Sequence, residues 1–475
     1  MAGSALQDYL RSTSPDRIDT AFVAYLAALS EVATVAPDVA ASIVHELGDQ
    51  RRNLKLIASE NYCSLATQLA MGNLLTDKYA EGFPEHRFYA GCANIDAIEA
   101  RACEEAKQLF GAAHAYVQPH SGADANLIAY WAILETRVGV PGLEKLGEKN
   151  PAQLPAEKWN QLRQELGNQR LLGLDYYSGG HLTHGYRFNV SARMFDVHSY
   201  AVDRETGLLD YAAIERQARE VKPLILLAGY SAYPRSINFR RMRQIADAVG
   251  AVLMVDMAHF AGLVATGHHP SPIGHADVVT STTHKTLRGP RGGLVMATEE
   301  HAKAVDKQVF PGTQGGPLMH VIAAKAVAFR EALDPGFADY SGRVIANAKA
   351  LAEGLMERGF MLVSGGTDNH LLLVDLRSRG VTGKVAEKAL DRAGITVNKN
   401  TVPGETESPF VTSGIRIGTP ALTTRGFGVD EMRAIAGLID RVIAKADDEA
   451  VADQVRGEVR EMCGRFPLYG DWWRT

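Results

Sequence analysis

The chain has 475 residues, of which 46% are hydrophobic and 22% are charged, and its formal net charge is −5. This length exceeds what one small core needs, so we expect two or three domains, and the balanced charge gives no electrostatic reason to expect a nucleic acid or membrane partner. Four cysteines without a C-x-x-C pair indicate reduced thiols rather than a disulfide framework. The N-terminus lacks a signal-peptide pattern, so we expect a cytoplasmic location.

The first fifty residues have the apolar spacing of helices. Apolar residues recur at helical intervals from Ile18 to Val32, and Asp16 lies where an N-cap is expected. Such an arm cannot bury its apolar face alone. We therefore expect residues 1–52 to pack on the body of the protein or on a partner subunit.

Between about residues 110 and 300, short apolar runs alternate with helical stretches. The clearest runs are Pro223–Ala228, Ala251–Val255, Ala276–Thr280 and Gly293–Met296. The helical stretch Asn238–Val249 ends at Gly250, a favourable C-cap. This alternation predicts a mostly parallel sheet covered by helices on both faces, with ligands at the C-terminal ends of its strands. Polar residues with Pro and Gly at 137–170 predict a surface insertion that contains a short helix, Ala156–Leu166.

The remainder of the chain has the pattern of a smaller α+β unit. After a helix predicted at Pro317–Leu333, the predicted elements of this unit are helices Tyr340–Arg358, Thr382–Ala393 and Asp430–Ala446 and strands His370–Leu376 and Gly414–Ile417. The sequence Asp334-Pro335-Gly336 favours a turn. We therefore predict a large α/β domain at 53–333 and a small C-terminal domain at 334–475.

Two predicted strand ends are followed by residues whose side chains can take part in chemistry, Lys285 and Asp256. Lys285 follows the run Ala276–Thr280, and its amine can form a Schiff base with an aldehyde only if its pKa falls below the usual value of about 10.4. Asp256 ends the run Ala251–Val255 and can pair with a protonated pyridine nitrogen, which makes the ring a good electron sink. The alternatives are a surface lysine and an aspartate that caps a turn.

Three further features bear on binding. His120-Ser121-Gly122-Ala123 opens a predicted helix at Ala125–Leu134, whose first amides would cradle a phosphate. Arg416 lies in an apolar strand and needs an anionic partner, either a substrate carboxylate or an internal salt bridge. The histidines around His268 lie in a Pro/Gly-rich loop and match no common metal-ligand spacing, so we predict no metal site.

Several long motifs occur over about residues 53–470: Leu56-Ile57-Ala58-Ser59-Glu60-Asn61, Lys78-Tyr79-Ala80-Glu81-Gly82, Gly179-Gly180-His181-Leu182-Thr183-His184-Gly185, Thr282-Thr283-His284-Lys285-Thr286, Phe310-Pro311-Gly312-Thr313-Gln314-Gly315-Gly316-Pro317 and Ser413-Gly414-Ile415-Arg416. In these motifs the sequence resembles the serine hydroxymethyltransferase family, which belongs to the fold type I (aspartate aminotransferase-like) pyridoxal-phosphate enzymes. The resemblance implies a seven-stranded, mostly parallel sheet.

The resemblance also implies a role for each matching residue. Lys285 would hold the cofactor covalently, and the catalytic residues would be Lys285, Glu81, His259 and Asp256. Further cofactor contacts would be Ser121, Gly122, His181, Ser231 and His284, with Tyr79 and Gly316 supplied by a neighbouring subunit. The substrate would contact Ser59, Tyr89, Arg416 and Glu81, and tetrahydrofolate would contact Leu182, Gly180 and Asn400. Tyr176 departs from the family, which often has a smaller apolar residue there, and Ala123 stands where many members have serine.

The implied activity is the reversible transfer of a hydroxymethyl group from serine to tetrahydrofolate, a reaction of one-carbon metabolism that yields glycine and methylenetetrahydrofolate. A shared active site implies a homodimer or a tetramer. Two alternatives are a folate-independent aldolase that cleaves 3-hydroxy amino acids at the same site and a non-catalytic binding protein.

Overall fold

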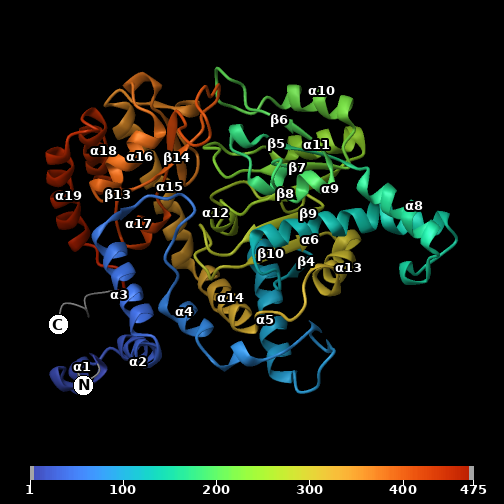
Figure 1. The fold of residues 1–475 in the computed structure, drawn as a ribbon, viewed down its shortest axis with the longest axis horizontal. Helices are drawn as coiled ribbons and strands as arrows, with labels where there is room; N and C mark the ends of the chain where they lie inside the picture. Colours follow the sequence, from blue (N-terminus) through green and yellow to red (C-terminus); the bar gives the residue numbers. More distant parts are fainter. Residues whose placement is uncertain (1–4, 470–475) are drawn as a thin grey trace.

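The structure, a computed structural model, describes residues 5–469. Its larger unit is built on a seven-stranded sheet with the order β4-β10-β9-β8-β7-β5-β6 (Figure 1). The strands are β4 (His114–Tyr116), β5 (Arg170–Leu174), β6 (Asp196–Tyr200), β7 (Ile225–Gly229), β8 (Val252–Asp256), β9 (Val278–Thr282) and β10 (Gly293–Ala297). Only β10 is antiparallel to its neighbours, so the predicted mostly parallel sheet is confirmed.

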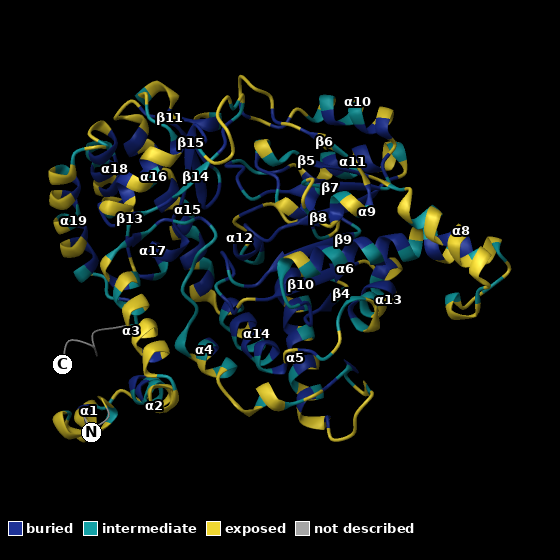
Figure 2. Cartoon of the chain, viewed as in Figure 1, coloured by how far each residue is buried: buried dark blue, intermediate teal, exposed yellow. Residues whose placement is uncertain are grey.

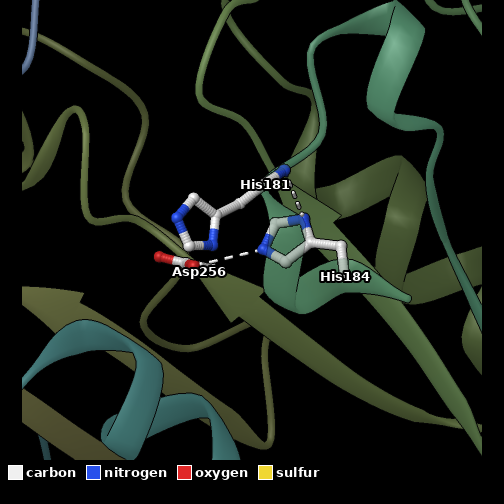
Figure 3. Close-up of side chains that lie close together, drawn as sticks. All are labelled: His181, His184 and Asp256. Carbon is white, nitrogen blue, oxygen red and sulfur yellow. Dashed lines mark hydrogen bonds and ion pairs between the residues drawn. The ribbon is translucent and has the colours of Figure 1, made fainter. Parts of the chain in front are cut away.

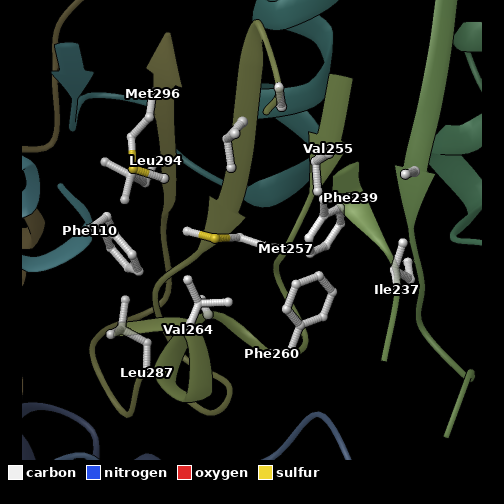
Figure 4. Close-up of a cluster of buried hydrophobic side chains, with 14 of the residues drawn as sticks. Phe110, Ile237, Phe239, Val255, Met257, Phe260, Val264, Leu287, Leu294 and Met296 are labelled. Carbon is white, nitrogen blue, oxygen red and sulfur yellow. The ribbon is translucent and has the colours of Figure 1, made fainter. Parts of the chain in front are cut away.

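Helices cover both faces of this sheet because side chains on each strand alternate between two cores. Leu226 on β7 packs in one core and Leu227 in the other. The first core receives α5 (Ala93–Phe110), α10 (Tyr211–Val221), α11 (Phe239–Val249), α12 (Ala261–Ala265) and α14 (Met319–Ala332). Figure 4 shows part of it, where Phe110, Met257 and Phe260 fill the space under the strands. The second core receives α6 (Gly122–Leu134) and α13 (Glu299–Lys307).

The smaller unit has a four-stranded antiparallel sheet, ordered β11-β12-β15-β14. Its strands are β11 (Met361–Leu362), β12 (Leu371–Asp375), β14 (Asn398–Asn400) and β15 (Gly414–Gly418), and its helices are α15 (Pro335–Met356), α16 (Gly383–Arg392), α17 (Pro420–Thr424), α18 (Val429–Ala444) and α19 (Glu449–Gly464). Helix α15 begins five residues before the predicted Tyr340, because the Asp334 carboxylate caps its first turn by accepting from the Gly336 amide at 2.8 Å.

The structure differs in one respect from the boundary that we predicted near residue 52. Strand β1 (Leu54–Lys55), which we assigned to the larger unit, pairs in parallel with β13 (Ile395–Thr396) of the smaller one. Leu54 and Leu56 are fully buried in the core of the smaller unit. The chain therefore contributes strand β1 to the smaller unit before it forms the larger unit. The division into three parts stays a prediction.

The predicted helical arm consists of α1 (Ala5–Ser12), α2 (Thr20–Val35) and α3 (Pro37–Arg52) and lies at the edge of the molecule (Figure 1). The N-cap of α2 is Asp19, whose carboxylate accepts from the Ala21 amide at 2.8 Å. Asp16 was therefore the wrong choice of cap: it lies in a short 3₁₀ turn just before. Helix α3 joins the arm to the body, where the Arg51 guanidinium donates to the Leu468 carbonyl.

The segment at 137–170 projects from the larger unit. Helix α6 runs on through a wide turn at Glu135–Gly139 into α7 (Val140–Lys145), and α8 (Ala156–Gly167) confirms the predicted short helix. Only Leu162 of α8 is buried, and Figure 2 shows the rest of the helix largely exposed. Among the described residues, no helix combines the length and apolar character needed to cross a membrane.

Candidate active site

A cavity of about 650 Å³ lies where the ends of β7, β8 and β9 face β14 and β15 of the smaller unit. This size suits a small-molecule ligand. Most of the predicted site residues line the cavity: Ser59, Gly122, Gly180, His181, Leu182, Ser231, Asp256, His259, His284, Lys285, Asn400 and Arg416. The ends of parallel strands thus collect the polar groups, as expected for this class of sheet.

Lys285 lies three residues beyond the end of β9 and is buried, with 8% of its surface exposed. Burial, together with the nearby charges of Arg416 and Arg291 and against the opposing effect of Asp256, lowers the pKa of its amine to about 8. The expected fall in pKa is confirmed, and the alternative of a surface lysine is wrong. A deprotonated amine, the nucleophilic form, is therefore accessible near neutral pH.

Asp256 is the last residue of β8 and accepts three hydrogen bonds. Its Oδ2 accepts from Asn126 Nδ2 at 2.9 Å and from His184 Nε2 at 3.1 Å, and its Oδ1 accepts from the Ala258 amide at 3.0 Å. Burial alone would raise its pKa, but the hydrogen bonds from His184 and Asn126 hold the pKa well below its usual range. The carboxylate also caps a turn, as the alternative suggested, and Oδ1 retains one lone pair for another donor.

Three possible metal ligands, His181, His184 and Asp256, have ligand atoms within 4.8 Å of one another (Figure 3). His184 uses both ring nitrogens for hydrogen bonds: Nε2 donates to Asp256, and Nδ1 accepts from the His181 amide at 3.4 Å. His181 Nδ1 lies 2.7 Å from the Thr183 hydroxyl, and burial lowers the pKa of the His181 ring to about 4. These bonds engage the same atoms that a metal would need. The arrangement fits a network that orients Asp256.

The sequence did not identify Asn126 as a site residue. Its Nδ2 donates to Asp256 and to Thr183 Oγ1 at 2.7 Å, and its Oδ1 accepts from Thr280 Oγ1 at 2.5 Å. Asn126 lies on α6, in which most residues are apolar and buried. That isolated amide in a buried apolar stretch was the one available signal, since its partners come from distant segments.

The start of α6, which we predicted to bind a phosphate, lies at the cavity. The amides of Gly122 and Ala123 belong to its first turn, where helix geometry leaves N–H groups without an intrahelical acceptor, and both residues line the cavity. A Cβ on Gly122 would lie 2.5 Å from Thr282 Cγ2, so the backbone approaches β9 closely. Ser121 does not line the cavity. Its hydroxyl caps the helix, accepting from the Asp124 amide at 3.1 Å and donating to the Asp124 carboxylate at 2.8 Å.

Arg416 of β15 closes the opposite side of the cavity. Its Nε donates to Asn398 Oδ1 at 3.1 Å and its Nη1 to the Ser231 carbonyl at 2.6 Å. Burial lowers its pKa to about 10. No carboxylate within residues 5–469 forms an ion pair with it, so the alternative of an internal salt bridge is wrong there. A half-buried, orientated guanidinium of this kind is suited to bind a carboxylate ligand.

Two histidines in the cavity wall are neutral at neutral pH. Burial, reinforced by the charge of Lys285, holds the pKa of His259 well below its usual range, and burial lowers the pKa of His284 to about 3. His259 Nδ1 lies 3.2 Å from Nε2 of His370, a fully buried residue that the sequence did not single out. His259 is thereby left with one ring nitrogen for the cavity.

The residues that we predicted for folate, Leu182, Gly180 and Asn400, line the same cavity, with Tyr176 beside them. Gly180 is required by close packing, since a Cβ there would lie 2.0 Å from the Leu174 carbonyl oxygen. These contacts stay predictions. The cavity wall also contains an ion pair that we did not predict, Lys399 Nζ to Glu387 Oε2 at 3.1 Å.

Four predicted residues lie apart from the cavity, in a cluster of their own. The hydroxyls of Tyr79 and Tyr89 donate to the Glu81 carboxylate at 3.3 and 3.1 Å, and a Cβ on Gly316 would touch the Tyr79 ring. Tyr79 and Tyr89 are 56% and 46% exposed. None of the four lines the cavity around Lys285 within one chain.

Comparison with known proteins gives one consistent result. A family model described as serine hydroxymethyltransferase matches residues 32–147 and 162–439, and its gap falls inside the predicted insertion. Two curated relatives carry the same name. The protein of Treponema pallidum is 58% identical over 99% of this chain and 85% of its own length. The protein of Mycolicibacterium smegmatis is 55% identical over 96% of this chain and 95% of its own length.

Proposed function

Because the chain belongs to the serine hydroxymethyltransferase family, we propose that it catalyses the pyridoxal-phosphate-dependent interconversion of serine and tetrahydrofolate with glycine and methylenetetrahydrofolate. The observation that carries the proposal is the convergence of four groups on one cavity: the amine of Lys285, the carboxylate of Asp256, the amides at Gly122 and the guanidinium of Arg416. We propose a cytoplasmic location for the enzyme.

The cavity fits the cofactor. Lys285 would hold its aldehyde carbon, the free lone pair on Asp256 Oδ1 would accept from its ring nitrogen, and the Gly122 and Ala123 amides would bind its phosphate. When bound, pyridoxal phosphate supplies an electron-poor ring that stabilises negative charge on the substrate. Asp256 is fit to keep that ring protonated because its own pKa is held so low.

We propose that serine binds beside Arg416. The Arg416 guanidinium has no carboxylate partner of its own within residues 5–469 and would bind the substrate carboxylate, with Ser59 on the same wall. His259 is neutral and would form one hydrogen bond in the cavity through its remaining ring nitrogen. The buried surroundings strengthen each of these interactions by excluding water.

Glu81 is the group that we propose handles the proton of the serine hydroxyl and of folate. It does not reach the cavity of its own chain, and its exposed cluster with Tyr79 and Tyr89 is suited to complete the cavity of a second copy. We therefore propose a homodimer with shared sites. Mixing Lys285→Ala with Glu81→Gln protein tests this, because one site in each mixed dimer would keep both native residues. Recovery of activity on mixing is expected, and its absence would argue against shared sites.

Glycine formation from serine by the purified protein, with and without tetrahydrofolate, tests the reaction itself. We expect turnover that depends on tetrahydrofolate and that Glu81→Gln abolishes, while the variant still binds pyridoxal phosphate. Equal rates with and without tetrahydrofolate would instead indicate a folate-independent aldolase. A protein whose absorbance does not change on adding pyridoxal phosphate would contradict both.

A further inference from the structure

Helix α14 carries a buried lysine that the proposed reaction does not use. Lys325 has 1% of its surface exposed, and its ammonium donates to three backbone carbonyls: Pro119 at 3.0 Å, Gly293 at 2.8 Å, and Val117. It forms no ion pair with a carboxylate in the described part of the chain. An isolated buried cation is costly, so its retention calls for a reason.

The three acceptors favour the charged, ammonium form of Lys325. An ammonium has three N–H donors, whereas a neutral amine has two and would direct its lone pair at the third carbonyl. Burial lowers the pKa of Lys325 to about 7, although the nearby Cys103 and Glu99 oppose this effect. The carbonyl oxygens thus replace the solvation of the cation.

Those carbonyls belong to the segment that leads into α6. Val117 and Pro119 follow β4, and only two residues separate Pro119 from Gly122. The Gly293 amide donates to the same Pro119 carbonyl at 2.9 Å, which ties the segment to β10. A Cβ on Gly292 would lie 2.4 Å from Lys325 Cε, so the lysine stem fills the space beside this strand.

A second side chain, Gln314, holds the intervening peptide groups. Its Nε2 donates to the Gln118 carbonyl at 3.1 Å, and its Oε1 accepts from the His120 amide at 3.0 Å. Consecutive residues before α6 are therefore fixed by Lys325 and Gln314 in turn. These hydrogen bonds restrict the backbone at the end of β4 and in the turn that leads into α6. The first amides of α6 are therefore preorganised.

We propose that Lys325 is a positioning residue for the anion-binding start of α6. Its ammonium fixes the backbone of residues 117–119 and places a buried positive charge beside the segment that leads to the amides of Gly122 and Ala123, which favours a phosphate there. The inference rests on the proposed function in one respect, that the anion is the phosphate of the cofactor. A lysine that merely supports the core would affect ligands with and without phosphate alike.

The test compares pyridoxal phosphate with pyridoxal, which carries the same aldehyde without the phosphate. Dissociation constants of both are measured by absorbance titration of cofactor-free wild-type protein, Lys325→Met and Lys303→Met. Methionine keeps an unbranched stem and removes the charge, and Lys303 on α13 is an exposed control. We expect Lys325→Met to raise the dissociation constant of pyridoxal phosphate at least tenfold and that of pyridoxal by no more than twofold. Lys303→Met should change neither constant.

The ratio of the two constants does not depend on the fraction of protein that is folded, and Lys325→Gln, which keeps two donors, serves if the methionine variant does not fold. Equal weakening of both ligands, or no weakening, would overturn the role of Lys325. A wild-type protein that binds both ligands equally would instead refute the phosphate site of the proposed function. The two failures are therefore distinguishable.

Discussion

Replacing Lys285 by methionine is expected to stabilise the cofactor-free protein at neutral pH while abolishing its activity. Lys285 is buried, and its pKa falls from 10.5 to about 8, mainly through loss of hydration. At about 1.4 kcal/mol for each pKa unit, keeping the ammonium in this cavity costs about 3 kcal/mol. Methionine has a similar unbranched stem and no charge, so the variant avoids this cost.

The stabilisation of the cofactor-free protein by Lys285→Met must depend on pH in a defined direction. Below pH 8 the folded and unfolded chains both carry the proton, so the full cost applies. Between pH 8 and 10.5 only the unfolded chain keeps the proton, and the stability of the wild-type protein rises toward that of the variant. Above pH 10.5 both states are neutral and the difference contributed by this amine disappears.

Thermal unfolding of the cofactor-free proteins measures the effect. With an unfolding entropy of about 2.1 cal/mol/K per residue, 475 residues give about 1 kcal/mol/K, so the melting temperature should rise by about 3 °C at pH 7. Lys349→Met, at an exposed position on α15, is the matched control and should change it little. An unchanged or lower melting temperature for Lys285→Met at pH 7, or a gain that persists at pH 10.5, would refute the burial argument.

Three further substitutions test the cavity. Gly122→Ala places a Cβ 2.5 Å from Thr282 Cγ2 and should lower the free energy of unfolding in denaturant by about 1–3 kcal/mol. Adding Thr282→Ser removes that methyl group and should recover most of the loss. The absence of any recovery would contradict the close contact. Arg416→Lys should raise KM for serine about 10- to 100-fold, because hydrogen bonds to a charged group contribute about 1.5–3 kcal/mol; an unchanged KM would exclude the proposed carboxylate contact. Asp256→Asn replaces the carboxylate that accepts from Asn126 and His184 by an amide. It should lower kcat by about 10²-fold or more at saturating cofactor. A near-native kcat would exclude Asp256 from the mechanism.

Residues at strand ends were predictable because local sequence defines both the strand and the residues that come after it. Lys285 and Asp256 each lie at or shortly after the end of an apolar run, and the parallel sheet brings such positions to one edge. Long motifs shared with the family identified His181 and Arg416 as candidate site residues, and both line the cavity. The fold class was predictable from the alternation of strands and helices over residues 110–300.

Contacts that depend on distant partners were not predictable. Asn126 and Lys325 lie in helices with ordinary helical patterns, and only tertiary structure shows that one bonds to Asp256 and the other to the segment before α6. The pairing of β1 with β13 joins residues more than 300 positions apart, which periodicity cannot reveal. The misplaced cap at Asp16 has a local cause: two aspartates, Asp16 and Asp19, precede the helix, and only the backbone conformation selects between them.

The two buried lysines show why a lowered pKa does not by itself locate a reactive amine. The pKa is lowered to about 8 at Lys285 and to about 7 at Lys325, so the second is the more perturbed. Yet Lys325 has an acceptor for each N–H and is enclosed by backbone, which stabilises the ammonium and leaves no room for a carbonyl carbon. Lys285 Nζ makes no hydrogen bond within residues 5–469 and lines the cavity beside Asp256. Access and unmatched donors, rather than the size of the pKa change, are therefore the grounds on which we propose Lys285 as the nucleophile and Lys325 as part of the support for α6.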